Sequence, residues 1–371
     1  MFINFWYPVA WSDDVGQRPL KVRMLGCDFA VFRDSAGKVH CLADTCIHRY
    51  ASLSAGKVAD DSLQCPYHGW RFGADGRCVL IPSLGPGSKI PPRARVDSYP
   101  VEERYGLIFA FLGDLPTDQR APILEIPEWD QPGWKFNRIS YTWHVNFQRA
   151  IENALDPGHT QFVHPAMGAG SDKEFLIPDV PVDETSWGAG TMMSFYPPKP
   201  RGFWGLLRKE GTTVVSGSGY HGVTHFWTKV HITAKAFSHQ YGFDCPVDPF
   251  TVKVFFLQAR NFFTASIFQR SVDRRTWAVA NQDRDVIHTV SPTLTPERRN
   301  AEVSVRADIL SNHYRQRLKS WEDRGWRIDT DALSRSDPRR DTFAIPSPAR
   351  REQRGWCLEQ VPLVQPTATA L

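Results

Sequence analysis

Apolar residues in the first 115 positions come in short alternating runs, separated by Gly, Pro, Ser and Asp residues that favour turns. Alternation of this kind predicts strands, because successive side chains of a strand point to opposite faces of a sheet. The expected strands are 21–23, 29–33, 39–43, 77–81 and 107–112. No helical periodicity interrupts them, so we predict a small all-β domain over residues 1–115.

From Tyr141 onward the pattern changes to a mixture of helices and strands. A helix is expected over 143–155, ending where Asp156-Pro157-Gly158 breaks it. Alternating runs at 223–232, 237–244 and 251–263 predict an antiparallel sheet. The chain as a whole is therefore predicted to be α+β, with an all-β domain followed by an antiparallel sheet covered by helices.

Two further helices are expected after the sheet. The first covers about 275–290. The second begins at Thr295-Pro296, because Thr is a favourable cap and Pro suits the first helical position, and it ends at Gly325. Its apolar stripe, expected to pack against a core, consists of Val303, Leu310, Tyr314, Leu318 and Trp321.

At 371 residues the chain is long for one hydrophobic core, which favours two domains. Residues 114–134 are rich in proline and acidic residues, so a linker is placed at 116–140. The second domain then spans 141–345. The tail, 346–371, is expected to be loosely ordered.

The amino-acid composition limits which cellular compartment and which kinds of binding partner are expected. The 44 basic and 40 acidic residues are balanced, so no nucleic-acid footprint is present. The seven cysteines are scattered and odd in number, which indicates a reduced, cytoplasmic setting and not a disulfide framework. The N-terminus lacks the basic region and cleavage site of a signal peptide, and no apolar run reaches the length of a membrane span.

Two short loops carry the first chemical signal, Cys46-x-His48 and Cys65-x-x-His68. Two thiolates and two imidazoles suit either a tetrahedral zinc ion or a 2Fe–2S cluster with Cys on one iron and His on the other. Zinc sites more often group like ligands, as C-x2-4-C and H-x3-5-H. Here each loop supplies one Cys and one His, which favours the cluster.

The residues around these ligands, Cys-Ile-His-Arg at 46–49 and Cys-Pro-Tyr-His-Gly-Trp-Arg-Phe at 65–72, resemble the Rieske iron–sulfur family. The resemblance implies a Rieske domain holding a 2Fe–2S cluster through Cys46, His48, Cys65 and His68. Such a cluster stores one electron, so an electron acceptor is expected elsewhere.

A second candidate metal site contains His159 and His164. Positions five apart on an ideal helix are separated by about 140° and cannot share a metal, so the break at Pro157-Gly158 is required. Two histidines and a carboxylate form the facial triad of non-haem Fe(II) oxygenases. The run Asp156-x2-His159-x4-His164 is similar to the catalytic iron motif of Rieske oxygenases.

By that resemblance the third iron ligand is an Asp on a downstream helix. Asp283 matches best, although Gln282 stands where the family usually has an acidic residue. Asp285 is the first alternative and Asp273 the second. Asp156 would end the helix in any case, and the resemblance implies that it also bridges a cluster histidine of one subunit to an iron histidine of the next. A homotrimer is implied.

Other signals are weaker. Gly217-Ser-Gly219-Tyr-His-Gly222 matches a dinucleotide-binding pattern, but a strand follows it where a helix is required. His221, His225, His231 and His239 are expected to be ordinary strand residues. No flavin, nicotinamide or second ferredoxin motif occurs, so electrons from NAD(P)H must arrive through a separate ferredoxin or flavin reductase.

The prediction is therefore the terminal oxygenase of a Rieske system, with a cluster, a mononuclear non-haem Fe(II) and O2 as co-substrate. The run Asn153 to His164 and the opening Phe5-Trp-Tyr-Pro resemble the single-subunit monooxygenase and demethylase branch. Hydroxylation or oxidative demethylation of an aromatic or polycyclic molecule is expected. The alternatives are a cis-dihydroxylating dioxygenase, a Rieske electron carrier, or a zinc-ribbon interaction protein.

Overall fold

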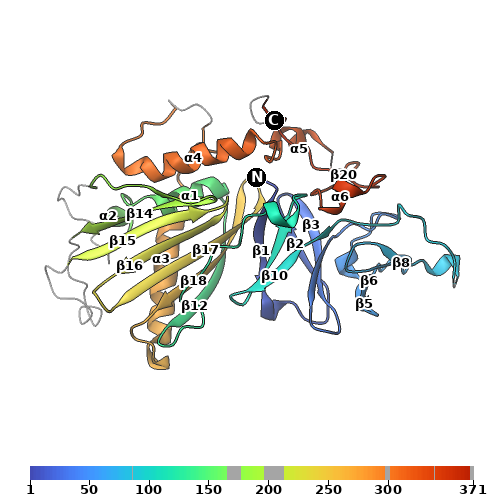
Figure 1. Cartoon of the computed structure of the whole chain (residues 1–371), viewed down its shortest axis with the longest axis horizontal. Coiled ribbons are helices and arrows are strands. Elements are labelled where there is room, and N and C mark those ends of the chain that lie inside the picture. Colours follow the sequence, from blue (N-terminus) through green and yellow to red (C-terminus); the bar gives the residue numbers. More distant parts are fainter. Residues whose placement is uncertain (86, 165–176, 196–212, 297–300, 338, 368–371) are drawn as a thin grey trace. The chain divides into compact units, whose positions relative to one another are not determined.

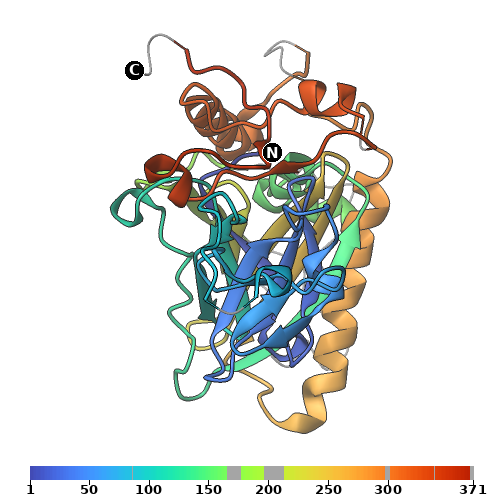
Figure 2. The ribbon, with the colours of Figure 1, turned by 90° about the vertical axis from the view of Figure 1, so that its right-hand side faces the viewer.

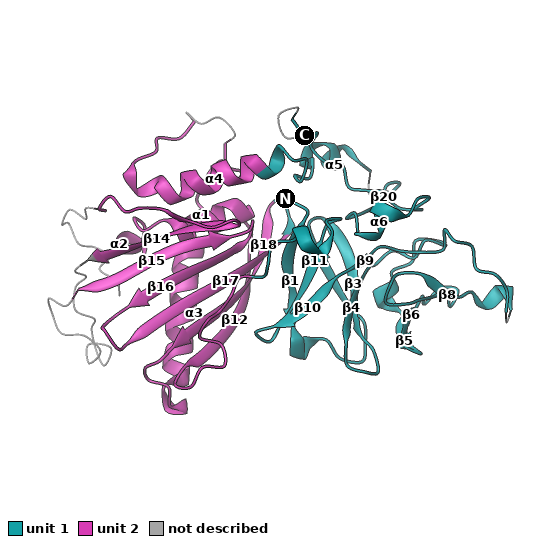
Figure 3. Cartoon of the chain, viewed as in Figure 1, with its two compact units in different colours: residues 1–123, 247–249, 321–371 teal, residues 124–246, 250–320 magenta. Residues whose placement is uncertain are grey.

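A computed structural model describes residues 1–85, 87–164, 177–195, 213–296, 301–337 and 339–367 (Figure 1). The chain forms two compact units that are each discontinuous in sequence (Figure 3). Unit 1 consists of residues 1–123, 247–249 and 321–371, and unit 2 of residues 124–246 and 250–320.

Unit 1 is built on three small antiparallel sheets. Their strand orders are β2-β3-β4-β9, β1-β11-β10 and β5-β6-β7-β8. The bounds are β1 Phe5–Trp11, β2 Leu20–Met24, β3 Cys27–Arg33, β4 Val39–Ala43, β5 Lys57–Ala59, β6 Ser62–Gln64, β7 Arg71–Phe72, β8 Cys78–Leu80, β9 Ser98–Tyr99, β10 Val101–Arg104 and β11 Leu107–Leu112. The all-β prediction for this region is confirmed, because all five expected strands are present.

The C-terminal segment of unit 1 is ordered, so the expectation of a loosely ordered tail is wrong for residues 346–367. The short strands β19 (Phe343–Ala344) and β20 (Glu359–Gln360) pair in parallel. Arg350 donates to both carboxylate oxygens of the buried Asp97, at 2.7 Å each. A buried carboxylate needs such a partner, and this pairing across distant sequence positions leaves no local pattern.

Unit 2 contains a seven-stranded antiparallel sheet in the order β12-β18-β17-β16-β15-β14-β13. Its strands are β12 Lys135–Trp143, β13 Asp183–Glu184, β14 Gly188–Phe195, β15 Val214–His221, β16 His225–His231, β17 Phe237–Asp248 and β18 Thr251–Arg260. Its helices are α1 Phe147–Leu155, α2 Thr160–Val163, α3 Gln269–Ile287 and α4 Ile309–Glu322, whose last two residues belong to unit 1. Figure 2 shows α3 along its length. The predicted α+β class is confirmed.

Two helix starts differ from the prediction. Trp143 ends strand β12, and α1 begins at Phe147 because Asn146 caps it by accepting from the Gln148 N–H at 2.9 Å. The last long helix begins at Ile309 and not at Thr295. Before it, the Asp308 carboxylate accepts from the Val305 N–H at 2.7 Å.

The apolar stripe predicted for the last long helix is correct in four of its five members. Val303 lies before the helix and is 94% exposed, so it does not belong to the stripe. The other four side chains are buried and recur every three or four residues: Leu310, Tyr314, Leu318 and Trp321.

The glycine-rich run at 217–222 lies on strand β15 and the turn after it, which confirms that it does not open a helix. A Cβ at Gly219 would lie 2.4 Å from the Trp227 ring of the neighbouring strand β16. The glycine therefore makes room for a cross-strand aromatic side chain.

Candidate metal centres and catalytic cavity

The first ligand loop is closed by two backbone hydrogen bonds around Cys46. The Cys46 N–H donates to the Ala51 carbonyl at 2.9 Å, and the Tyr50 N–H donates to the Cys46 carbonyl at 2.8 Å. Tyr50 adopts a left-handed conformation with φ of 58°. These bonds turn the chain sharply, so Cys46 and His48 lie on one tight loop.

The second loop repeats the same arrangement around Cys65. The Cys65 N–H donates to the Trp70 carbonyl at 2.7 Å, and the Gly69 N–H donates to the Cys65 carbonyl at 3.2 Å. Gly69 has φ of 70°, matching Tyr50 of the first loop. Two loops of one design therefore present a Cys and a His each.

The four side chains fit a two-iron cluster better than a single zinc ion. Cys46 and Cys65 are both buried, and the rings of His48 and His68 lie 4.5 Å apart. Each loop supplies one thiol and one imidazole, so the two sulfurs can bind one iron of a cluster and the two imidazoles the other. A structural zinc site more often groups like ligands within one loop, so the paired loops favour the cluster.

Protonation and packing also suit a cluster. Burial raises the pKa of the Cys46 thiol to about 12, so a thiolate here requires a bound cation. Burial, with the charges of His68 and Arg49, lowers the pKa of His48, which keeps this imidazole neutral as a ligand must be. Its Nδ1 is buried and has no hydrogen-bond partner among the described residues, and Trp70 stacks on the ring at 4.5 Å.

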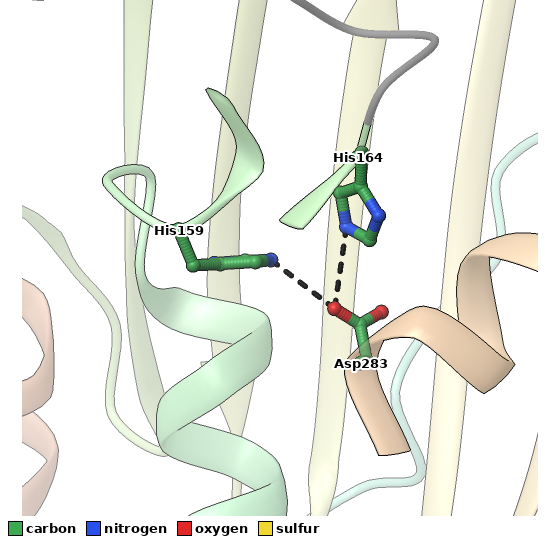
Figure 4. Close-up of side chains that lie close together, drawn as sticks. All are labelled: His159, His164 and Asp283. Atoms are coloured by element: carbon green, nitrogen blue, oxygen red, sulfur yellow. Dashed lines mark ion pairs between the residues drawn. The ribbon is translucent and has the colours of Figure 1, made fainter. Parts of the chain in front are cut away.

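The second candidate centre begins where helix α1 ends. Asp156 follows Leu155 as the C-cap, and the short helix α2 starts only at Thr160. His159 and His164 lie at the two ends of α2, with their rings 5.4 Å apart. The predicted break in the helix is therefore present, and it brings the two rings to one place (Figure 4).

Helix α3 supplies the third side chain. Its buried residues Thr276, Ala280 and Ile287 recur at helical spacing, and Asp283 falls on the same face. Asp283 Oδ1 lies 3.5 Å from His159 Nε2 and 3.2 Å from His164 Nε2 (Figure 4). Three ligand atoms thus face one point, as a facial triad requires.

The two alternative aspartates lie elsewhere. Asp285 forms an ion pair with Arg284 at 2.8 Å, and its side chain is 68% exposed. Asp273 accepts hydrogen bonds from Asn137 and Gln269. Neither is brought to the two histidines.

Gln282 contributes a contact that sequence reasoning missed. Its Oε1 lies 2.9 Å from His164 Nδ1, which donates to it when Nε2 is the metal-facing nitrogen. Burial alone would lower the pKa of His164, but the contacts with Asp283 and Gln282 raise it. Sequence reasoning noted Gln282 only as a departure from the family's acidic residue, although an amide oxygen accepts this bond as well.

Asp156 is held as a carboxylate close to His159. It accepts from the Gly158 N–H at 2.7 Å and from the His159 N–H at 3.1 Å, and its Oδ2 lies 3.6 Å from His159 Nδ1. Burial would raise the pKa of Asp156, but these contacts lower it below its usual value. Its side chain remains 34% exposed, so the carboxylate is not closed off by its own contacts.

A cavity of about 320 Å³ lies between the sheet and helices α1 and α3, and the triad lines it. The apolar part of its wall comes mainly from Trp143, Phe226, Val230, Val254, Phe256 and Val279. Polar groups include Gln240, Asp244, Gln258, Arg260 and Arg275. This size and character fit a small, largely apolar ligand.

The four sheet histidines are absent from the described lining of this cavity. His239, for example, forms a 2.6 Å contact with the buried Glu128, which also accepts from the Tyr241 hydroxyl at 2.5 Å.

None of the described helices has the length and apolar character needed to cross a bilayer.

Comparisons with known proteins identify the family. Residues 5–100 match the Rieske [2Fe-2S] domain, and residues 143–324 match the vanillate O-demethylase oxygenase C-terminal domain. The methylxanthine N1-demethylase NdmA of Pseudomonas putida is 30% identical over 330 residues, which cover 85% of this chain and 88% of the demethylase. The chain therefore belongs to the Rieske non-haem iron oxygenases.

Structural neighbours and other relatives extend this result. The structure of NdmA has a TM-score of 0.70 and 26% identity, covering 86% of this chain and 91% of that one. The 4beta-methylsterol monooxygenase of Methylococcus capsulatus is 39% identical over 165 residues, or 43% of this chain and 44% of that enzyme. The chain spans about half the length of the first curated relatives that it matches.

Proposed function

We propose that this chain is the terminal oxygenase of a multicomponent Rieske system, which hydroxylates or oxidatively demethylates an aromatic or polycyclic small molecule. The observation that carries the proposal is the convergence of His159 Nε2, His164 Nε2 and Asp283 Oδ1 on the wall of a cavity of about 320 Å³. A pure electron carrier would need neither the second ligand set nor the cavity.

The roles of the ligands follow from their donor atoms. Cys46, His48, Cys65 and His68 would hold the 2Fe–2S cluster, and the triad would hold Fe(II). When bound, the two metal groups would supply electron storage and O2 activation. The Gln282 amide would fix the His164 ring so that Nε2 faces the metal.

Asp156 is proposed as the bridge by which an electron reaches the triad from the cluster of a neighbouring subunit in a homotrimer. Its lowered pKa and its contact with His159 support this role, because an ionised carboxylate orients and polarises an imidazole. Its partial exposure leaves an acceptor oxygen for a histidine of another subunit. Electrons from NAD(P)H would enter through a separate ferredoxin or flavin reductase.

The cavity supports the proposed substrate class. Its aromatic and aliphatic wall favours an apolar ring system, and its volume lies at the small end of the range for ligand pockets. Several relatives bear the names of demethylases and monooxygenases, which supports the same reaction class for this chain.

The test combines metal analysis with turnover. The purified protein is expected to contain about three irons and two acid-labile sulfides per chain. It should also couple O2 uptake to product formation with a surrogate reductase and a panel of methoxy- and methylarenes. Two irons without O2 uptake would assign an electron carrier, and a colourless zinc protein would exclude the family chemistry. A product carrying both atoms of O2 as two hydroxyl groups would assign dihydroxylation.

A further inference from the structure

Asp244 is an unpaired acidic side chain in the wall of the catalytic cavity. It lies on strand β17 and is 1% exposed, and neither of its carboxyl oxygens has a hydrogen-bond partner among the described residues. Its backbone is satisfied, because its N–H donates to the Thr224 carbonyl at 2.9 Å. The side chain of Asp244 therefore has no hydrogen-bond partner among the described residues, and it lines the cavity.

Two other polar side chains of the same wall make hydrogen bonds to protein atoms. Gln258 accepts from the Thr276 hydroxyl at 2.5 Å and donates to the Ser238 hydroxyl at 3.2 Å. The Arg260 guanidinium donates to the Asn137 side chain. A buried polar group without a partner costs free energy, so such groups are rare unless a ligand satisfies them.

The protonation state of this carboxyl follows from its surroundings. Burial raises the pKa of Asp244 well above its usual range, and no positive charge of the described residues opposes that rise. Burial without a compensating charge therefore favours the neutral carboxylic acid, which has one O–H donor and a carbonyl acceptor. Such a group recognises uncharged partners better than ions.

Asp244 and the three residues of the triad line the same cavity. Burial raises the pKa of Tyr141, and the carboxyls of Asp244 and Asp283 add to that rise when they are ionised. Tyr141 lies directly across from Val254 in the β12–β18 pairing, and both line the cavity. A substrate bonded to Asp244 would therefore lie in the same cavity as the proposed iron ligands.

We propose that Asp244 determines specificity by donating a hydrogen bond from its carboxyl O–H to a carbonyl, ether or ring-nitrogen acceptor of an uncharged substrate. A cationic ligand is disfavoured because Arg260 and Arg275 line the same cavity. An anionic ligand would add a charge beside the carboxylates of Asp156 and Asp283. This inference rests on the proposed function only in taking the cavity as the substrate site.

The test measures binding to oxidised holoenzyme without O2 or reductant, so its failure is distinct from a failure of turnover. Four para-substituted anisoles of similar size serve as calorimetric probes: 4-methoxybenzamide, 4-methoxybenzoate, 4-methoxybenzylamine and 4-methylanisole. The wild type is expected to bind the amide about tenfold more tightly than 4-methylanisole. Asp244→Leu should abolish this preference, whereas Asp244→Asn, which keeps a neutral donor and acceptor, should retain it.

Two further readouts make the result decisive. Asp244→Leu should melt at or above the wild-type Tm, because it removes a buried unpaired carboxyl. Infrared difference spectra of wild type against Asp244→Asn should contain the C=O stretch of a protonated acid. The proposal is overturned if the wild type has no preference for the amide, if the preference survives Asp244→Leu, if the amine or benzoate binds most tightly, or if both variants lower Tm.

Discussion

The two proposed ligand sets of this protein are built in different ways. Cys46, His48, Cys65 and His68 lie on two neighbouring loops, each closed by the same pair of backbone hydrogen bonds. His159, His164 and Asp283 come from two distant segments and meet because helix α3 packs against α1 and α2. The first site depends on local chain geometry, whereas the second depends on tertiary packing.

The largest effects are expected when one proposed metal ligand is removed from each site in turn, because each variant should lose a different metal group. Asp283→Ala is expected to reduce iron from about three to about two per chain while the visible spectrum of the cluster is retained. Turnover should fall by more than the roughly 10- to 100-fold that the loss of an outer partner costs. Cys65→Ser should instead remove the cluster spectrum and leave the mononuclear iron.

The matched control for the triad variant is Asp285→Ala, which removes an exposed acid two residues away. It should keep all three irons and nearly normal turnover. If Asp285→Ala lost the mononuclear iron and Asp283→Ala kept it, the register of α3 would be wrong. Iron analysis and electron paramagnetic resonance of both variants decide this.

Asp156→Asn tests the proposed electron path between the two sites. Its effect on metal content should be smaller than that of removing a ligand. Both metals should stay bound, because Asp156 is not among the proposed ligands, while turnover falls on the order of 10- to 100-fold. The lowered pKa of Asp156 means that the carboxylate stays ionised through neutral pH and is lost only as pH falls through that low value. The wild-type single-turnover rate should therefore be independent of this group near pH 7.

The measurement is the rate at which the reduced cluster is reoxidised with substrate and O2 present. Asp285→Asn is the control for loss of one negative charge near the site. Undiminished turnover in Asp156→Asn would exclude the bridge.

The difference between the sites also explains what sequence reasoning could establish. The proposed cluster loops could be predicted from short local spacings. The proposed roles of His159 and His164 needed, in addition, the resemblance to the Rieske family and the break at Pro157. The third ligand is different, because only a short resemblance favoured Asp283 over Asp285 and Asp273. The packing of α3, which turns Thr276, Ala280 and Ile287 inward, places Asp283 beside the two histidines.

Sequence reasoning missed or misjudged the features that depend on contacts between residues distant in the chain. The acceptor role of Gln282 requires the position of His164, and the isolation of Asp244 requires the whole sheet. The order of the C-terminal segment depends on the buried pairing of Arg350 with Asp97. None of these contacts leaves a periodic or motif-like signal in the chain.

Gln282 offers a finer test of the packed site. Gln282→Leu removes the acceptor for His164 Nδ1 and should weaken mononuclear iron binding by about 10- to 100-fold, because the ring is no longer oriented. Gln282→Glu keeps an acceptor and restores the acidic residue usual in the family, so it should retain the iron. Iron retention during stepwise chelation measures the difference, with the cluster spectrum as internal control. Equal iron loss from both variants would rule out the orienting role.

The smallest effects are expected in the two loops of the cluster site, where Tyr50 and Gly69 occupy equivalent positions. Gly69→Ala places a Cβ on a residue with φ of 70° and 3.2 Å from Pro82 Cγ, which should cost about 1–2 kcal/mol. Tyr50→Gly relieves the same backbone conformation at an exposed position and should change stability by about 1 kcal/mol or less in the opposite direction. Thermal unfolding followed by cluster absorbance measures both changes. Changes of opposite sign in the unfolding free energy would show that both loops carry the same backbone constraint. Destabilisation by both substitutions would mean that the Tyr50 side chain makes stabilising contacts that the second loop lacks at Gly69.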